Sequence, residues 1–426
     1  MSTRRSATQP KGTQSVAFLN PWLIYAVIGG GVLFLYSLGW SELYAPLEPG
    51  LLIFFTGTIV VSVVMGMRLQ TRLRSLPPEG PAVEAHRAPK SVTMVIVAGF
   101  LGQFAYLGHA PLTDNLILHA GYEYGDFPGI PGLTVLLVTF SIFYSTLLAY
   151  RASRAVGRRR LSLAVQFIAI QSMFLLLLSR QAILLCLVMA AFLFLSRTRL
   201  TGRRVFVAAV AAVVVMYSFG GLGNLRSGDG FNDSSYITQF SIVSASFPAA
   251  VPGQFLWSYM YIVSPLGNLN DLVGNVPPTY SYSDMVVNMF PDFLTKRLFP
   301  DFDPTTPITV PYFNVSTGYS AAWKFNGYLA LWATFIVLMV IASGAPRLVR
   351  PSWERATWAV ACGIVVFMFY NNALSYSGVS LALAFPVLGS LVKVSAAARQ
   401  ERRPAGSVGI PRGAGASSRP PPARQR

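Results

Sequence analysis

Long apolar runs with few charges recur along the chain, and they constrain its fold more than any other feature. About 20 apolar residues cross the hydrocarbon core of a bilayer as a helix. Runs of this kind lie near 20–39, 50–67, 91–107, 132–150, 161–179, 182–196, 205–220, 327–345, 356–371 and 378–395. With 53% hydrophobic and only 12% charged residues, the chain is predicted to be an all-α polytopic integral membrane protein with about ten transmembrane helices.

The positions of the basic residues predict the orientation of these helices, because cytoplasmic connections are enriched in Lys and Arg. With a cytoplasmic amino terminus, 28 of the 33 basic residues lie inside and 12 of the 16 acidic residues lie outside. The five basic residues outside are Arg180, Arg226, Lys296, Arg297 and Lys324. We therefore expect a basic cytoplasmic segment at 1–19 and a disordered basic cytoplasmic tail at 396–426.

The predicted spans fall into two blocks, 20–220 with spans 1–7 and 327–395 with spans 8–10. Between them lies one large extracytoplasmic loop, 221–326, which is rich in Tyr, Asp, Asn and Pro. Residues 249–265 of this loop are apolar but are interrupted by Pro252 and Pro265. A further span there would place the basic tail outside. We therefore expect an interfacial or re-entrant helix near 249–265.

The fifth and sixth spans share only residues 161–196, so each helix reaches roughly 25 Å and falls short of the roughly 30 Å hydrocarbon core. The turn Ser179-Arg180-Gln181 is then recessed at the outer leaflet. A charge at that depth is costly unless it is paired or lines a water-filled cavity, which makes Arg180 a candidate functional residue. The alternative is an arginine that extends to the lipid headgroups.

Metal and cofactor sites are not expected. Cys186 and Cys362 both lie inside apolar runs, and the chain has three histidines. The run Gly220-Gly221-Leu222-Gly223 lacks the strand, the helix and the Lys-Ser/Thr pair of a phosphate-binding loop. Although the net charge is +17, the basic residues lie beside membrane spans, so we expect no nucleic-acid partner.

Several motifs, taken in order, resemble the bacterial O-antigen polymerase (Wzy-type) family of oligosaccharide repeat unit polymerases. They are residues 40–47 (WSELYAPL), 124–131 (YGDFPGIP), Ser179-Arg180, residues 224–227 (NLRS), residues 259–268, residues 314–317 (NVST), the following Tyr319, and Gly327. One departure is the run Lys324-Phe325-Asn326-Gly327, where the family pattern has an acidic residue. The resemblance implies an enzyme of the bacterial inner membrane that joins undecaprenyl-diphosphate-linked repeats on the outer face.

Such a reaction expels a lipid diphosphate, which departs without protonation if its charge is stabilised. Arg180 and Arg226 are predicted at the outer boundary, and we expect them to clamp the diphosphate as catalytic residues. The alternative for Arg226 is an ion pair with Asp229 or Asp233. A general base is expected among His109, His119, Glu123 and Asp126. Phenols, amides and hydroxyls predicted to bind the substrate are those of Asn224, Tyr259, Tyr261, Asn268, Asn314, Thr317 and Tyr319, together with the ammonium of Lys324.

Other functions are compatible with parts of this pattern. An O-antigen ligase has a similar overall shape, but a histidine near the last outer motif would be expected for it. A flippase for lipid-linked glycans would show internal repeats or charges near the bilayer midplane. A membrane O-acyltransferase is less favoured, because its histidine and arginine pattern is missing. A polymerase would have the lipid-linked oligosaccharide as substrate and a chain-length regulator and flippase as partners.

Overall fold

The computed structural model describes residues 16–74, 90–118, 129–130, 132–198, 201–227, 229–303, 305, 308, 313 and 315–391. Within these ranges the regular structure is helical, and the extended pairing is an isolated antiparallel bridge between Ser41 and Val243. Residues 1–15 of the segment predicted to be a cytoplasmic amino terminus, and the whole predicted cytoplasmic tail, 396–426, lie outside the described residues.

A helix lies in each of the ten ranges predicted to span the membrane. They are α1 (Pro21–Ser37), α2 (Pro49–Arg74), α4 (Lys90–Leu107), α6 (Leu133–Ala152), α7 (Gly157–Leu176), α8 (Arg180–Leu195), α9 (Gly202–Arg226), α14 (Ser320–Gly344), α15 (Pro351–Phe367) and the helical segment Ser377–Leu391, which opens with α16 (Ser377–Ser380). Six of them, α2, α4, α6, α7, α9 and α14, are long and apolar enough to cross a membrane. An all-α membrane protein is confirmed for the described residues, while ten crossings and cytoplasmic termini stay predictions.

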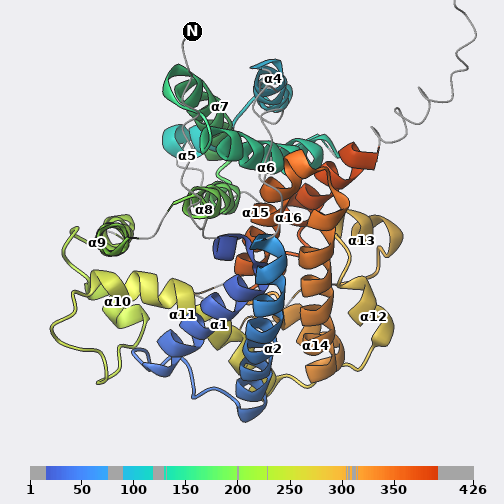
Figure 1. The fold of residues 1–426 in the computed structure, drawn as a ribbon. Coiled ribbons are helices and arrows are strands. Elements are labelled where there is room, and N and C mark those ends of the chain that lie inside the picture. The colour runs from blue at the N-terminus through green and yellow to red at the C-terminus, as the bar shows by residue number, and fades with distance from the viewer. Residues whose placement is uncertain are drawn as a thin grey trace, which may run out of the picture.

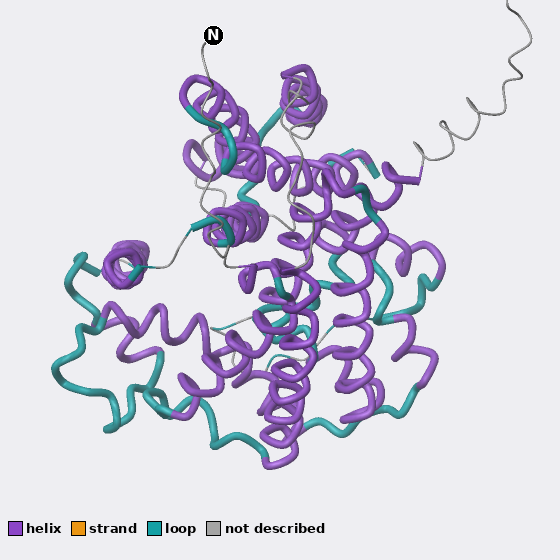
Figure 2. Tube along the Cα trace, in the orientation of Figure 1, coloured by secondary structure: helices purple, strands orange, loops and turns teal. Residues whose placement is uncertain are grey.

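The apolar helices do not form a single parallel bundle. In Figure 1, α2 and α14 stand upright, α6 runs across the view, and α8 and α9 are seen nearly end-on. The tube in Figure 2 shows the same two orientations, with α9 set apart from the other long helices. Helix α9 packs against α11 (Gln254–Asn275), and only 11% of its apolar window is buried. Its exposed face is therefore one that a bilayer would cover.

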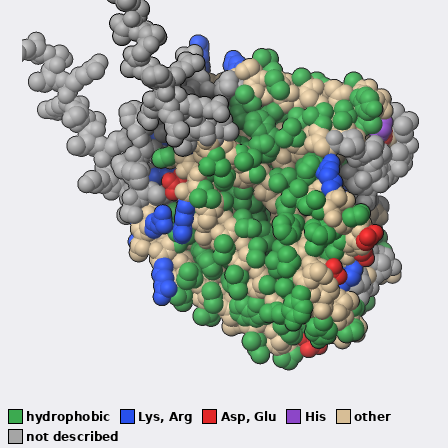
Figure 3. Space-filling model, turned by 90° about the vertical axis from the view of Figure 1, so that its right-hand side faces the viewer, with side chains coloured by type: hydrophobic (Ala, Val, Ile, Leu, Met, Phe, Trp, Pro, Cys, Tyr) green, Lys and Arg blue, Asp and Glu red, His purple; other side chains and the backbone are tan. Residues whose placement is uncertain are grey.

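On the face seen in Figure 3, charged side chains gather at the margins of an apolar surface. Figure 3 shows a broad face of hydrophobic side chains, with most of its basic side chains at one margin and most of its acidic side chains at the opposite margin. Exposed apolar residues on α14 include Leu329, Ile336 and Val340. Such a belt between two charged rims is typical of a protein immersed in lipid.

Helix α1 occupies the centre of the fold, packed against α2, α11, α14 and α15. Its Tyr25 is fully buried, and the phenol lies 3.2 Å from Thr58 Oγ1 and 2.8 Å from the hydroxyl of Tyr319. The rings of Phe54 and Phe55 pack on Tyr319. These contacts join α1, α2 and the start of α14 through one polar pair inside an aromatic core.

The loop between the two membrane blocks is largely helical. It contains α10 (Ser235–Phe240), α11, α12 (Tyr282–Val287) and α13 (Asp292–Leu298), and a further short helix, α5 (Pro111–Leu118), follows α4. The helix expected near 249–265 begins at Gln254 and continues through Pro265 to Asn275. A proline inside a helix costs about 3 kcal/mol. Burial of Leu266, Leu269 and Leu272 in the turns that follow explains why the helix continues.

Helix α14 is broken where the eighth span was predicted to begin. Asn326 and Gly327 have non-helical backbone angles, and the φ of +55° at Gly327 favours glycine. The break frees the carbonyls of Lys324 and Phe325, which accept hydrogen bonds of 2.8 Å from the backbone N–H groups of Thr279 and Ser281. The turn before the break therefore belongs with the large loop, and the apolar helix follows it.

Candidate functional site

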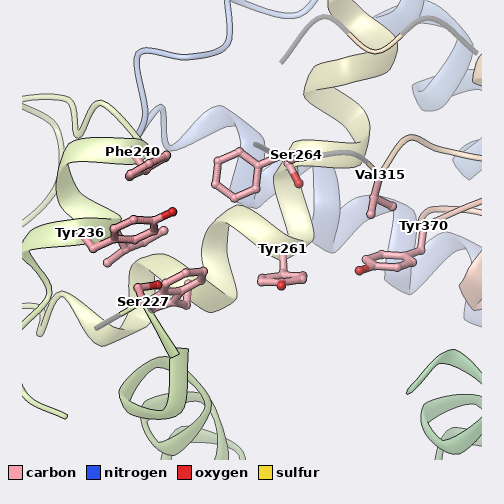
Figure 4. A pocket seen from close by; sticks show the side chains of 10 residues that line it. Ser227, Tyr236, Phe240, Tyr261, Ser264, Val315 and Tyr370 are labelled. Atoms are coloured by element: carbon pink, nitrogen blue, oxygen red, sulfur yellow. The ribbon is translucent and has the colours of Figure 1, made fainter. Parts of the chain in front are cut away.

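A cavity of about 360 Å³ lies where the ends of α9 and α15 meet α10 and α11. It is lined by Ser227, Tyr236, Ile237, Phe240, Trp257, Tyr261, Ser264, Phe313, Val315 and Tyr370. Figure 4 shows several of these side chains around the central Tyr261. The volume falls in the range of pockets that hold small ligands. Six of the ten side chains are aromatic, and two serines and three tyrosines supply hydroxyl groups.

Glycines on α9 create one wall of the cavity by letting α11 approach closely. A Cβ atom at Gly220 would clash with the backbone carbonyl of Gln254, and one at Gly223 would lie 2.7 Å from the ring of Trp257. This explains the Gly220–Gly223 run as a helix-packing surface.

Asn224 lies beside these glycines, is fully buried, and has both ends of its amide engaged. Its Oδ1 accepts a 2.7 Å hydrogen bond from Trp257 Nε1. Its Nδ2 donates to the carbonyl of Phe231 and to Ser234 Oγ, each at 3.2 Å. Predicted as a substrate-binding residue, Asn224 in this structure positions Trp257 and the segment that leads to α10.

Two pairs of aromatic residues with helical i, i+4 spacing form the apolar platform of the cavity. Tyr236 and Phe240 on α10 stack with ring centroids 4.0 Å apart. Tyr236 also lies nearly parallel to Trp257 of α11 at 6.2 Å, and Trp257 is 6.4 Å from Tyr261. Ring faces of this kind combine apolar area with the polar tips of tyrosine and tryptophan.

The opposite wall is held by Asn268, which follows Trp257, Tyr261 and Ser264 on the same face of α11. Its buried amide nitrogen donates hydrogen bonds to the carbonyls of Phe313 (2.6 Å) and Val315 (2.7 Å). Asn268 thus fixes the strip of chain that closes the cavity. Asn314, between these two residues, lies outside the described residues.

Arg180 is not among the lining residues of the cavity. The hairpin turn before it ends α7 with Leu178 in the left-handed region and a 2.9 Å hydrogen bond from Ser179 N–H to the Phe174 carbonyl. Arg180 then begins α8, is exposed, and lies within electrostatic range of Tyr370. Tyr370 in turn lines the cavity and lies near Tyr261. The structure therefore places the first predicted arginine in the neighbourhood of one lining residue, Tyr370, and outside the lining itself.

Arg226 is the last residue of α9, directly before Ser227, which lines the same cavity. The backbone therefore places the second predicted arginine at the border of the cavity. The two arginines come from different helices, α8 and α9. Each is near a residue that lines the cavity, Arg180 near Tyr370 and Arg226 next to Ser227.

The predicted bases are not among the lining residues. His109 follows α4, and its Nδ1 lies 2.7 Å from Asp114 Oδ2 of α5. The two side chains are 34% and 15% exposed, so Asp114 can orient an imidazole that still reaches solvent. His119, Glu123 and Asp126 lie outside the described residues. No lining residue of the cavity carries a carboxylate or imidazole.

Three of the remaining predicted substrate-binding residues serve the fold. Tyr259 is buried, accepts a 3.1 Å hydrogen bond from Trp40 N–H, and packs on the Trp40 ring. Thr317 is buried against Ser320. Tyr319 belongs to the core pair with Tyr25. Direct contact between a substrate and any of these side chains would require the surrounding structure to open.

Lys324 holds a loop in place. Its Nζ lies 3.1 Å from both Asp303 Oδ2 and the Asp303 carbonyl, and 3.2 Å from the Thr305 carbonyl. Hydrogen bonds from Thr305, and then Lys324, hold the pKa of the Asp303 carboxyl at about 2, below the ordinary 3.8. We refer to this set of contacts as the Lys324 latch.

We expect Lys324→Met to release the segment around Asp303 and to expose Phe302, which packs 5.1 Å from the ring of Phe325. Chymotryptic cleavage after Phe302 should become faster at pH 7, and Lys296→Met is the control because Lys296 is exposed and lies 3.9 Å from Asp292. Since the folded pKa of Asp303 is depressed, its contribution is complete above about pH 4 and is lost as pH falls toward 2. Equal cleavage of the two variants would show that the latch does not hold the loop.

Tyr236, Phe240, Phe313 and Tyr370 line the cavity without having been singled out from the sequence as individual site residues. The i, i+4 spacing of Tyr236 and Phe240 was an available signal. Tyr370 lies at the end of a predicted span, where aromatic residues are common in any membrane protein, so its position gave no sign of a binding site.

No family model, no curated protein and no solved structure matches this chain.

Proposed function

We propose that this protein is a membrane glycosyltransferase that polymerises undecaprenyl-diphosphate-linked oligosaccharide repeat units on the outer face of the bacterial cytoplasmic membrane. The proposal is supported by an aromatic, hydroxyl-bearing cavity that has the Arg226 end of α9 at its border and Arg180 within electrostatic range of one lining residue, Tyr370. A lipid diphosphate needs cationic donors at the membrane boundary, and a sugar needs aromatic faces and hydroxyl partners.

In the proposed reaction, the bond between the anomeric carbon and the diphosphate oxygen breaks, and the electron pair stays on that oxygen. Arg180, and Arg226 from the end of α9, stabilise the growing negative charge. An acceptor hydroxyl of the next lipid-linked unit forms the new bond to the anomeric carbon. Its proton passes to the departing diphosphate, which is the basic group nearest to the reaction in this arrangement.

His109 is the alternative proton acceptor, but it does not line the cavity, so this alternative requires the acceptor hydroxyl to lie at the turn between α4 and α5. With Nδ1 bound to Asp114, Nε2 is the ring nitrogen that would take the proton from the acceptor hydroxyl. The apolar platform of Tyr236, Phe240, Trp257 and Tyr261 offers ring faces for sugars of the growing chain. The closing strip at Phe313 and Val315, held by Asn268, completes the binding site.

Deletion of the gene in its source bacterium should reduce the surface glycan from a ladder of chain lengths to single capped repeats, as seen on a gel. Restoring the intact gene should restore the ladder. Surface glycan that disappears while long lipid-linked polymer accumulates would instead indicate a ligase. Single lipid-linked repeats retained on the cytoplasmic face would indicate a flippase, and an unchanged ladder would contradict all three functions.

A further inference from the structure

Exposed apolar side chains recur at every fourth position along residues 280–299, the segment that contains α12 and α13. They are Tyr282, Val286, Phe290, Leu294 and Leu298. Each of these residues is between 38% and 66% exposed, and Tyr280 and Phe299 at the two ends of the segment are exposed as well. Single apolar residues scattered over a surface are ordinary, whereas a series of them on one short segment marks a surface that binds something.

The other sides of the two helices are already accounted for by the fold. Val287 of α12 and Thr295 of α13 are buried. On α13, the ammonium of Lys296 lies 3.9 Å from a carboxylate oxygen of Asp292, one turn earlier. Leu294 is two residues from Lys296, which corresponds to about 200° of helical rotation. The exposed leucine and the charged pair therefore lie on nearly opposite sides of α13.

Two hydrogen bonds tie the start of α12 to the break in α14. The backbone N–H groups of Thr279 and Ser281 donate to the carbonyls of Lys324 and Phe325 at 2.8 Å each. Helix α12 also packs against α14. The uninterrupted part of α14, a candidate membrane span, begins directly after this break. Helix α12 is therefore held at the level where that span begins.

The start of α13 is tied in the same way to the last apolar helical segment, Ser377–Leu391. Asp292 Oδ1 accepts a 2.8 Å hydrogen bond from the N–H of Ser377, and Ser377 Oγ accepts one of 2.8 Å from the N–H of Phe293. The N–H of Asp292 donates to the carbonyl of Ser375 at 2.6 Å. The α12–α13 segment thus connects the beginnings of two apolar helices, which is where the boundary of a bilayer would lie.

The exposed side of this segment adjoins a surface that lipid would cover. In Figure 1, α12 and α13 lie beside α14, on which Leu329, Ile336 and Val340 are exposed. Figure 3 views the molecule from this side and shows a broad face of hydrophobic side chains. A bilayer that covers α14 is therefore in position to cover the apolar side of α12 and α13 as well.

We propose that the α12–α13 segment is an interfacial anchor that lies in the headgroup region of the bilayer, with its exposed apolar side chains against the acyl chains. Short amphipathic helices bind membranes in this way, by removing apolar area from water. Tyr280 and Tyr282 suit the boundary, because a phenol combines an apolar ring with a polar tip. The anchor does not depend on the proposed glycosyltransferase activity, since its ligand is the bilayer itself.

Nitroxide labels on single introduced cysteines test the proposal in the full-length protein, reconstituted in liposomes of phosphatidylethanolamine and phosphatidylglycerol. The test variants are Val286→Cys and Leu294→Cys. Lys296→Cys is the water-facing control on the same helix as Leu294, and Ile336→Cys on α14 is the lipid-facing control. The two native cysteines are fully buried, so the label reaches the introduced thiol. Electron paramagnetic resonance then compares collisions of each label with oxygen, which concentrates in lipid, and with a water-soluble nickel chelate.

We expect the ratio of oxygen to nickel collisions at both test positions to be severalfold higher than at Lys296 and close to that at Ile336. A ratio at either test position equal to that at Lys296 would place the segment in water and overturn the proposal. Protection of the test positions from both reagents would overturn it too, because a protein partner or a second copy would then cover this side. Both test residues are exposed, so the variants should fold, and either one decides the question if the other does not.

Discussion

Arg180→Ala is expected to lower the rate of chain polymerisation by about 10²–10³-fold, which is typical of the loss of one donor that stabilises developing negative charge. Because Arg180 is exposed at the start of α8, its removal should leave folding nearly unchanged. Arg180→Lys should recover only part of the rate, since an ammonium keeps the charge but loses the planar fork. Detergent-solubilised protein supplied with lipid-linked repeats, with products separated by length, measures this rate.

The matched control for this experiment is Arg297→Ala. Arg297 also lies in the predicted outer region, but it donates to the carbonyl of Phe293 on its own helix, α13, at 3.0 Å. It should polymerise at the wild-type rate. If Arg180→Ala is as active as Arg297→Ala, Arg180 has no part in stabilising the leaving group, and the proposed site loses its principal support.

Gly220→Val is expected to destabilise the protein by about 3 kcal/mol, the upper end of the range for overpacking. The added Cβ would meet the backbone carbonyl of Gln254, and neither group can rotate away. Helix α11 would have to move as a whole, and it carries Trp257, Tyr261 and Ser264 of the cavity. Thermal unfolding with a thiol-reactive dye measures the loss, because Cys186 and Cys362 are both fully buried and free.

Gly30→Ala on α1 is the control for this variant. A Cβ atom there would have nothing within 4 Å, and alanine favours the helix over glycine by about 0.5–1 kcal/mol. The control should therefore match or slightly exceed the unfolding temperature of the wild type. An unchanged unfolding temperature for Gly220→Val would mean that α9 and α11 do not pack through this glycine.

Sequence patterns predicted the helices well because a membrane helix can be recognised from one continuous run of apolar residues. All ten ranges contain a helix, and the tight hairpin at Ser179-Arg180 follows from the length of the run alone. The helical continuation of α11 past Pro265 was not predictable in this way. It depends on burial of Leu266, Leu269 and Leu272, which is a property of the assembled protein.

Site residues were harder to predict, because the sequence does not show whether a polar side chain points into a cavity or bonds to a neighbouring segment of the chain. Asn224 and Asn268 were singled out for substrate, and both hold neighbouring chain segments. Tyr319 pairs with Tyr25, 294 positions earlier in the chain. Arg180 was singled out by local reasoning from the length of the hairpin run, and the structure describes it as exposed at the start of α8; its catalytic role stays a prediction.

The isolation of α9 has a consequence for how the protein is made. Residues 202–226 leave the ribosome well before residues 254–275, which form the helix that α9 packs against. If α9 crosses the bilayer, as its length and composition indicate, it does so during that interval without α11. Among the six candidate spans it has the highest mean hydropathy, 2.3, so lipid alone can retain it. The cavity would therefore form only after α11 has been synthesised and has packed against α9.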